Sequence, residues 1–110
     1  MKKTLALFLA LALMLCGAAM AETVYPYTVT DMGGNEITIE EQPTVVVSLT
    51  PSNTEVLYAL GAGALVKGVD SYSNYPAEAA ENATSVGSYA DTDIEAVLAL
   101  EPDVVFAGAG

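Results

Sequence analysis

Three tyrosines are the residues of this chain with the clearest capacity to bind a ligand. Tyr72 and Tyr75 follow a short run of apolar residues, and Tyr89 follows a polar segment that contains a possible short strand near Val86. Each side chain offers a flat apolar face and a hydroxyl group, a combination that suits a large planar or ring-bearing ligand. Ordinary loop packing explains any one of them equally well, whereas three at one edge of a fold indicate a binding site.

The chemistry that the chain lacks narrows its function. There is no histidine among the 110 residues, and the one cysteine is Cys16, near the N-terminus. Zinc and copper sites therefore lack their usual ligands, and a serine–histidine or cysteine–histidine catalytic pair is excluded within this chain. Asp91 and Asp93 lack the spacing of a calcium-binding loop and are better explained as acids at a helix start. We predict no metal, no cofactor and no catalytic residue; the alternative is an enzyme that uses carboxylates such as Asp70 or Asp91 as acid and base.

Runs of β-branched residues predict the strands that position these side chains. Residues 44–49 form a continuous run, typical of a strand inside a parallel sheet that is covered on both faces. Residues 65–69, residues 104–106 and a short segment near Val86 predict further strands. Helical segments separate them, and the order β-α-β-(α)-β-α-β favours an α/β fold in which helices flank a parallel sheet.

Two capping boxes predict where the main helices begin. Ser52 with Glu55, and Thr92 with Glu95, each place a hydroxyl residue three positions before a glutamate. Each helix also carries an apolar stripe that we expect to face the sheet. The stripes are Val56, Leu57 and Leu60 in the first helix and Ile94, Val97 and Leu98 in the second.

The parallel arrangement predicts where a ligand binds. In such sheets, ligands bind beyond the carboxyl ends of the strands. This rule places residues 50–53, 70–75 and 89–92 and the segment near Gly108 at one edge. The candidate ligand-binding residues are therefore Ser52, Asn53, Tyr72, Tyr75 and Tyr89.

The N-terminal segment is typical of an export signal. Lys2 and Lys3 precede an apolar run at residues 5–15 that is too short to span a bilayer, and residues 19–21 have the small-x-small pattern of a cleavage site. We expect cleavage after Ala21 and a periplasmic or cell-surface protein; the less favoured alternative is a lipid anchor on Cys16. Residues 22–43 then form a linker and a short β-hairpin, and residues 44–110 form the α/β domain.

Charge limits the partners of the chain. It carries fourteen acidic and three basic residues, for a formal net charge of −11, and Lys67 is the only base after residue 21. Such a surface excludes nucleic acid, because phosphate contacts need Lys and Arg. It favours a basic partner surface or serves solubility alone. We expect a monomer.

Five segments in order and spacing resemble the N-terminal lobe of periplasmic binding proteins of the iron-siderophore and vitamin B12 class. They are residues 48–55, 60–61, 68–76, 86–89 and 94–105. The resemblance implies one Rossmann-like lobe of a bilobed protein, with the ligand between two lobes that a long helix joins. On this view the chain continues beyond residue 110 into the second lobe. The resemblance also implies delivery to an ATP-driven permease, whose arginines hold one surface glutamate per lobe; Glu95 matches that glutamate, and Glu55 is the weaker candidate.

The same resemblance narrows the set of candidate ligands. Residues 71–76 look most like the vitamin B12 binders, in which two aromatic side chains contact the corrin ring, and the matching positions here are Tyr72 and Tyr89. The second position is tryptophan in those proteins. The predicted function is capture of a corrinoid or a ferric siderophore, with haem as the alternative on the same scaffold. Manganese and zinc binders rank low because their histidine ligands are missing.

Overall fold

The computed structural model describes residues 22–108, which divide into two compact units at the junction between Gln42 and Pro43. The predicted signal segment, with its cleavage site and Cys16, lies outside the described residues. Within residues 22–108, no helix has the length and the apolar character needed to span a membrane.

The first unit contains the predicted β-hairpin. Strand β1 (Tyr27–Thr30) pairs with β2 (Glu36–Ile39) in antiparallel register. Asp31 closes the turn, because its Oδ1 accepts the backbone N–H groups of Gly33 at 2.9 Å and Asn35 at 2.8 Å. The hydrogen bonds from Asn35 are the main cause that lowers the pKa of the Asp31 carboxyl below its ordinary value.

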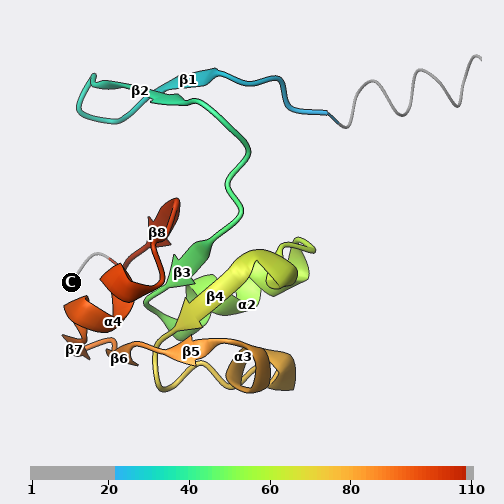
Figure 1. The fold of residues 1–110 in the computed structure, drawn as a ribbon, viewed down its shortest axis with the longest axis vertical. Helices are drawn as coiled ribbons and strands as arrows, with labels where there is room; N and C mark the ends of the chain where they lie inside the picture. The colour runs from blue at the N-terminus through green and yellow to red at the C-terminus, as the bar shows by residue number, and fades with distance from the viewer. Residues whose placement is uncertain (1–21, 109–110) are drawn as a thin grey trace, which may run out of the picture. The chain divides into compact units, whose positions relative to one another are not determined.

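The second unit is built on the predicted parallel sheet. It contains β3 (Val46–Ser48), β4 (Val66–Val69), β5 (Thr84–Ser85) and β8 (Val104–Phe106) in the order β5-β4-β3-β8. Every pairing among these four strands is parallel, which confirms the α/β prediction (Figure 1). Two shorter strands, β6 (Gly87–Ser88) and β7 (Asp91–Thr92), form an antiparallel hairpin after β5.

Helix α2 (Pro51–Ala59) begins earlier than its capping box predicts. Pro51 occupies the first turn, where its fixed φ angle suits a helix and its missing N–H is not needed. The cap is therefore Thr50 and not Ser52, and the Thr50 side chain accepts the N–H of Asn53. Glu55 consequently lies beyond the first turn, so the first predicted capping box is wrong.

The second capping box is also wrong, by one residue. Helix α4 (Ile94–Ala99) is capped by Asp93, whose Oδ1 accepts the N–H of Ala96 at 3.1 Å. Glu95 is therefore the second residue of the helix and not the third, and the N–H of the cap residue Asp93 is donated to the carbonyl of Val86 at 2.8 Å. Thr92 instead belongs to β7. A third helix, α3 (Ala77–Asn82), and a short 3-10 turn, η1 (Gly63–Leu65), complete the unit.

The core lies on both faces of the sheet. Successive strand residues point to opposite faces, so Val46 and Val47 of β3 belong to different clusters. Val46 packs with Leu57 of α2, and Val47 packs with Val97 of α4. The apolar stripes are thus narrower than predicted. Of the six stripe residues only Leu57 and Val97 are buried. The other four, Val56, Leu60, Ile94 and Leu98, are 56–77% exposed.

Candidate functional site

The rim is the edge of the sheet at the carboxyl ends of its strands. We use the term for residues 49–53 after β3, 70–76 after β4, 86–92 after β5 and 107–108 after β8. The sheet order reverses at β3, because β4 and β5 extend to one side of it and β8 returns to the other. Such a reversal makes a crevice at the strand ends, which is where ligands bind in open parallel sheets.

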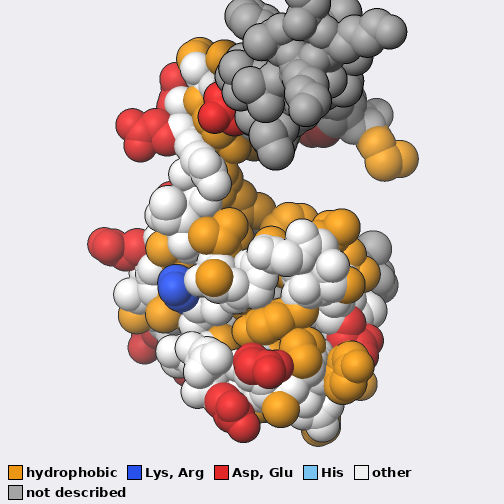
Figure 2. Space-filling model, turned by 90° about the vertical axis from the view of Figure 1, so that its right-hand side faces the viewer, with side chains coloured by type: hydrophobic (Ala, Val, Ile, Leu, Met, Phe, Trp, Pro, Cys, Tyr) orange, Lys and Arg blue, Asp and Glu red, His pale blue; other side chains and the backbone are white. Residues whose placement is uncertain are grey.

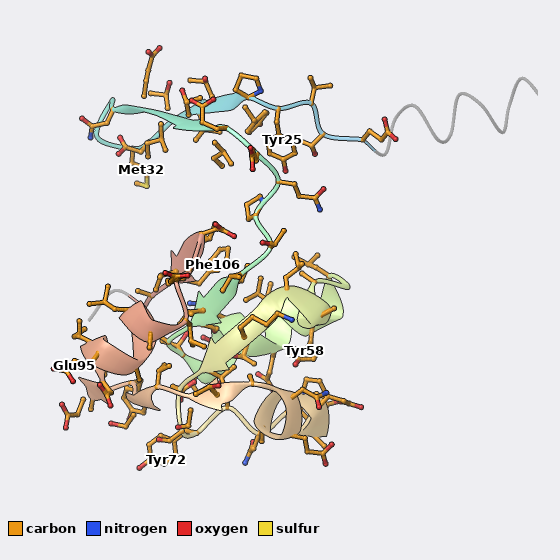
Figure 3. All side chains as sticks on the ribbon, viewed as in Figure 1. Tyr25, Met32, Tyr58, Tyr72, Glu95 and Phe106 are labelled. Carbon is orange, nitrogen blue, oxygen red and sulfur yellow. The ribbon has the colours of Figure 1, made fainter. Side chains whose placement is uncertain are left out.

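Two of the three predicted tyrosines meet at the rim. Tyr72 and Tyr89 have ring centroids 5.8 Å apart and planes inclined by 55°. Both remain accessible, with 61% and 63% of their surface exposed. Tyr72 comes from the loop after β4, and Figure 3 shows its ring projecting away from the strands. Tyr89 comes from the turn between β6 and β7. We call these two rings the tyrosine pair.

The other predicted ligand-binding residues stand apart from the tyrosine pair. Tyr75 is also exposed at the rim, but the described residues contain no ring contact between it and the pair. Ser52 and Asn53 lie in the first turn of α2, directly after β3. The Ser52 hydroxyl and the Asn53 N–H both contact the Thr50 hydroxyl, so the structure places these two residues at the same edge without joining them to the tyrosines.

A buried polar network lies where the loop that carries Tyr72 leaves the sheet. Ser48, Thr54, Asp70 and Ser73 are each at most 3% exposed, although all four carry polar side chains. The Thr54 hydroxyl donates to the Ser48 hydroxyl at 2.8 Å and shares a second contact of 2.8 Å with the Ser73 hydroxyl. The Ser73 hydroxyl donates to Oδ1 of Asp70. Because β3, α2 and the loop after β4 each contribute to it, this network ties three elements together.

Sequence reasoning missed this network. Ser48 follows a run of valines, and a polar residue at that position suggests only that the strand ends there. Thr54 lies one helical turn from Leu57 and therefore shares its buried face. The available signal was the coincidence of short polar residues at inward-facing positions of the strand and the helix. The partners of these residues lie far apart in the sequence, so spacing alone could not join them.

The carboxylates near the rim differ in accessibility. Asp70 is 2% exposed and both of its oxygens accept hydrogen bonds, so it cannot reach a substrate as the acid–base alternative requires. Asp91 and Asp93 are exposed, and the described residues contain no group of three or more potential ligands for a metal ion. Glu55 and Glu95 are exposed on α2 and α4, and neither carboxylate is hydrogen-bonded within residues 22–108. Figure 3 labels Glu95 on α4.

Comparison with known proteins identifies the family. The family model for periplasmic binding proteins matches residues 46–110. The chain therefore belongs to the periplasmic binding proteins, in the class that includes vitamin B12 and iron-siderophore binders, which confirms the resemblance noted in the sequence.

Particular relatives agree with this assignment. An uncharacterised ABC transporter substrate-binding lipoprotein, YvrC of Bacillus subtilis, is 42% identical over 84 residues, which are 76% of this chain and 26% of the relative. The periplasmic vitamin B12 binding protein BtuF of Vibrio cholerae superposes with a TM-score of 0.54 at 36% identity, over 57% of this chain and 24% of that one. A periplasmic heme binding protein of Pseudomonas aeruginosa gives 0.56 at 36% identity, over 58% and 23%. The chain thus spans about a quarter of the length of each.

Proposed function

We propose that the full-length protein is the extracytoplasmic solute-binding component of an ABC importer that captures a corrinoid or a ferric siderophore. The observation that carries the proposal is the tyrosine pair, two accessible rings 5.8 Å apart at the carboxyl edge of the sheet. Two tilted rings offer a broad apolar surface with hydroxyl groups at its margin. Such a surface can cover one face of a large ring-bearing ligand and orient its polar edge.

The relatives support the same class of ligand. One solved relative is named for vitamin B12 and another for heme, and both ligands are large macrocycles. Haem is accordingly the second candidate on the same scaffold. Residues 22–108 give little support to an enzymatic role, because both oxygens of the buried Asp70 carboxylate already accept hydrogen bonds.

The proposal includes export and delivery to a permease. We propose cleavage after Ala21 and a monomeric protein that docks through Glu95, with Glu55 as the weaker candidate. The relative from Bacillus subtilis is named a lipoprotein, which supports the alternative of a lipid anchor on Cys16. In both cases the protein would act outside the cytoplasmic membrane.

A ligand titration tests the proposed function. Cyanocobalamin, ferrichrome and haemin are titrated into the full-length protein by calorimetry, and then into Tyr72→Ala and Tyr89→Ala. Loss of one aromatic contact surface should weaken binding of the true ligand by about tenfold. Leu60→Ala is the matched control, because Leu60 is an exposed apolar residue at the opposite end of α2 from the rim. The proposal is wrong if no compound binds below the millimolar range, or if both tyrosine variants bind like wild type.

A further inference from the structure

We propose that Asp70 is a positioning residue, whose buried carboxylate holds the loop after β4 in the conformation that pairs Tyr72 with Tyr89. The inference rests on the proposed function for what the tyrosine pair binds, but the positioning itself concerns this chain alone. Asp70 directly follows β4, and Tyr72 is two residues further along. The carboxylate therefore stands at the point where the loop leaves the sheet.

Both carboxylate oxygens of Asp70 accept hydrogen bonds from the loop that carries Tyr72. Oδ2 accepts the backbone N–H of Tyr72 at 3.1 Å, and Oδ1 accepts the Ser73 hydroxyl. The Ser73 N–H also donates to the Asp70 carbonyl at 3.1 Å. These bonds bracket Tyr72 on both sides in the sequence, so they fix the backbone from which its ring projects.

The Asp70 carboxylate has no cation to compensate its burial. Lys67 is the only Lys or Arg in residues 22–108, and its Nζ donates to the carbonyl of Ala64 at 2.9 Å. A buried carboxylate is costly unless hydrogen bonds replace the water it loses. Within the described residues, no buried side-chain oxygen or nitrogen lacks a partner. The bonds that satisfy this carboxylate are those of the loop, so releasing the loop would leave a buried charge without donors.

The network also anchors the loop to the rest of the rim. From Ser73 the contacts continue through the Thr54 hydroxyl to the Ser48 hydroxyl, which donates to the carbonyl of Thr50 at 3.2 Å. The backbone N–H of Asp70 donates to the carbonyl of Ser48 at 3.1 Å. The loop is thereby attached to the end of β3 and to the first turn of α2.

A separate bond connects this loop to the hairpin that carries Tyr89. The N–H of Ser71 donates to the carbonyl of Gly87 at 2.7 Å. Gly87 begins β6, and Tyr89 lies two residues further on. Asp70 fixes one side of Tyr72 and this bond fixes the distance to the neighbouring hairpin, so together they set the separation of the two rings.

The side-chain chemistry supplies a sharp pair of variants. Asp70→Ala removes both acceptors. Asp70→Asn keeps an oxygen for the Tyr72 N–H, and its amide can donate to the Ser73 hydroxyl. Ser73 can then donate to Thr54, Thr54 to Ser48, and Ser48 to the Thr50 carbonyl, so every hydroxyl keeps a partner. Asp70→Asn should therefore retain the ring pair that Asp70→Ala loses.

The ring pair is read by fluorine NMR of the full-length protein labelled with 3-fluorotyrosine, without any ligand. The Tyr89 resonance is assigned by its loss in Tyr89→Phe. In wild type, Tyr72→Leu should move this resonance, because it removes the neighbouring ring. In the Asp70→Ala background, Tyr72→Leu should change the Tyr89 chemical shift only slightly. In the Asp70→Asn background, Tyr72→Leu should change that shift as much as it does in wild type.

Two further variants separate positioning from general stability. Val97→Ala weakens the core on the other face of the sheet without touching the network, and the ring coupling should survive in it. If Asp70→Ala does not fold, Thr54→Val and Thr54→Ser replace it. Thr54→Val removes the hydroxyl that links Ser73 to Ser48 and should reduce the ring coupling. Thr54→Ser keeps that hydroxyl and should keep the ring coupling of wild type.

Affinity for cyanocobalamin and haemin provides the functional readout. Asp70→Ala should weaken binding about tenfold, as Tyr72→Ala does, and combining the two should add little further loss, since residues that act through one group are not additive. If wild type binds neither compound, the proposed function fails for these ligands and the fluorine spectra still decide the positioning. If the Tyr89 resonance responds to Tyr72→Leu equally in the Asp70→Ala and wild-type backgrounds, the positioning role is wrong and the proposed function stands.

Discussion

At the scale of single residues, the carboxylates of this chain differ in what their oxygens accept. Asp70 is buried and satisfied by the loop that follows it. Asp31 and Asp103 are exposed and accept backbone N–H groups that would otherwise lack a protein partner. Glu55 and Glu95 are exposed and accept no hydrogen bond within the described residues. The first three acids therefore support the fold, whereas the described residues give the last two no such role.

Asp103 should make the stability of the protein depend on pH. Its Oδ2 accepts the N–H groups of Thr44 and Val45, each at 2.9 Å, which connects the segment before β3 to the turn before β8. These bonds, with that of Thr44 the largest, lower the pKa of Asp103 below its ordinary value of 3.8. A lowered pKa in the folded state adds stability above the unfolded pKa, and that stability is lost as the pH falls through the folded value.

The matching experiment is thermal unfolding of Asp103→Asn from pH 7 to pH 2.5. The variant keeps the shape of the side chain and loses its charge, so its Tm should be lower than that of wild type at pH 7. The difference should disappear at acid pH, where the wild-type carboxyl is protonated. Glu101→Gln is the control for loss of a nearby exposed charge. A Tm difference for Asp103→Asn that stays constant over the whole range would contradict the assignment.

Residue types predicted the rings of the site but not their support. Tyr72 and Tyr89 could be identified as candidates because a loop that follows a strand is an unusual position for an aromatic residue of the core. Their contact could not be predicted, because it depends on the bond between Ser71 and Gly87 across two separate loops. Asp70 was predicted as a residue of the rim and, in the enzyme alternative, as an accessible acid or base. Its burial follows from three-dimensional neighbours that no local pattern reports.

At the scale of elements, strands were easier to predict than helix boundaries. A run such as residues 44–49 can bury its apolar side chains only in a sheet that is covered on both faces, and β3 lies inside that run. Helix starts depend on which of several polar residues captures a free N–H. Pro51 moved the first start upstream, and the bond from Asp93 to Val86 fixed the second. The hairpin of β6 and β7 was not predicted, because each strand has only two residues.

Gly87 controls this hairpin, and Gly87→Ala should disrupt it. Its φ is +90°, and a Cβ there would lie 2.6 Å from the Asp91 carbonyl oxygen and 2.9 Å from the Asp93 nitrogen. Both contacts are with backbone, which cannot move aside without breaking the pairing that presents Tyr89. The strain of the left-handed conformation and the clash together should lower the free energy of unfolding by roughly 2–5 kcal/mol.

Gly61→Ala is the matched control in chemical denaturation of the full-length protein. Gly61 has a similar φ of +82°, but a Cβ there would meet nothing within 4 Å. Gly61→Ala should therefore lower the free energy of unfolding only through the strain of the left-handed conformation, by about 1–2 kcal/mol. Ligand affinity should also fall in Gly87→Ala and not in Gly61→Ala, because only the first supports the tyrosine pair. Equal effects of the two substitutions on stability would show that the backbone contacts at Gly87 do not matter.

At the scale of the whole molecule, the function proposed above assigns ligand capture and partner docking to different parts of the second unit. The rings of the tyrosine pair are uncharged and lie on the rim with one exposed acid, Asp91, whereas the two candidate docking acids, Glu55 and Glu95, lie on helices α2 and α4. On the face in Figure 2, one basic side chain appears among several acidic ones, in keeping with fourteen acids and three bases in the chain. Charge should therefore affect encounter with a basic permease surface more than affinity for the ligand.

Glu95→Gln tests this separation. A partner arginine could hold the unbonded carboxylate in a bidentate pair, and a hydrogen bond to a charged group contributes about 1.5–3 kcal/mol. Association with the permease in nanodiscs should weaken by roughly 10- to 100-fold and lose part of its dependence on salt. Ligand affinity should not change, and stability should stay within about 0.5 kcal/mol because Asp93 provides the cap of α4.

Glu78→Gln distinguishes a specific contact from the effect of net charge. Glu78 is exposed in the first turn of α3, as Glu95 is in the first turn of α4, and each helix has six residues. The two variants therefore remove the same charge from equivalent positions. If both weaken permease binding equally, the acidic surface acts as a whole and Glu95 has no special role. A loss confined to Glu95→Gln would place the docking contact on α4, on the opposite face of the sheet from α2 and its exposed Glu55.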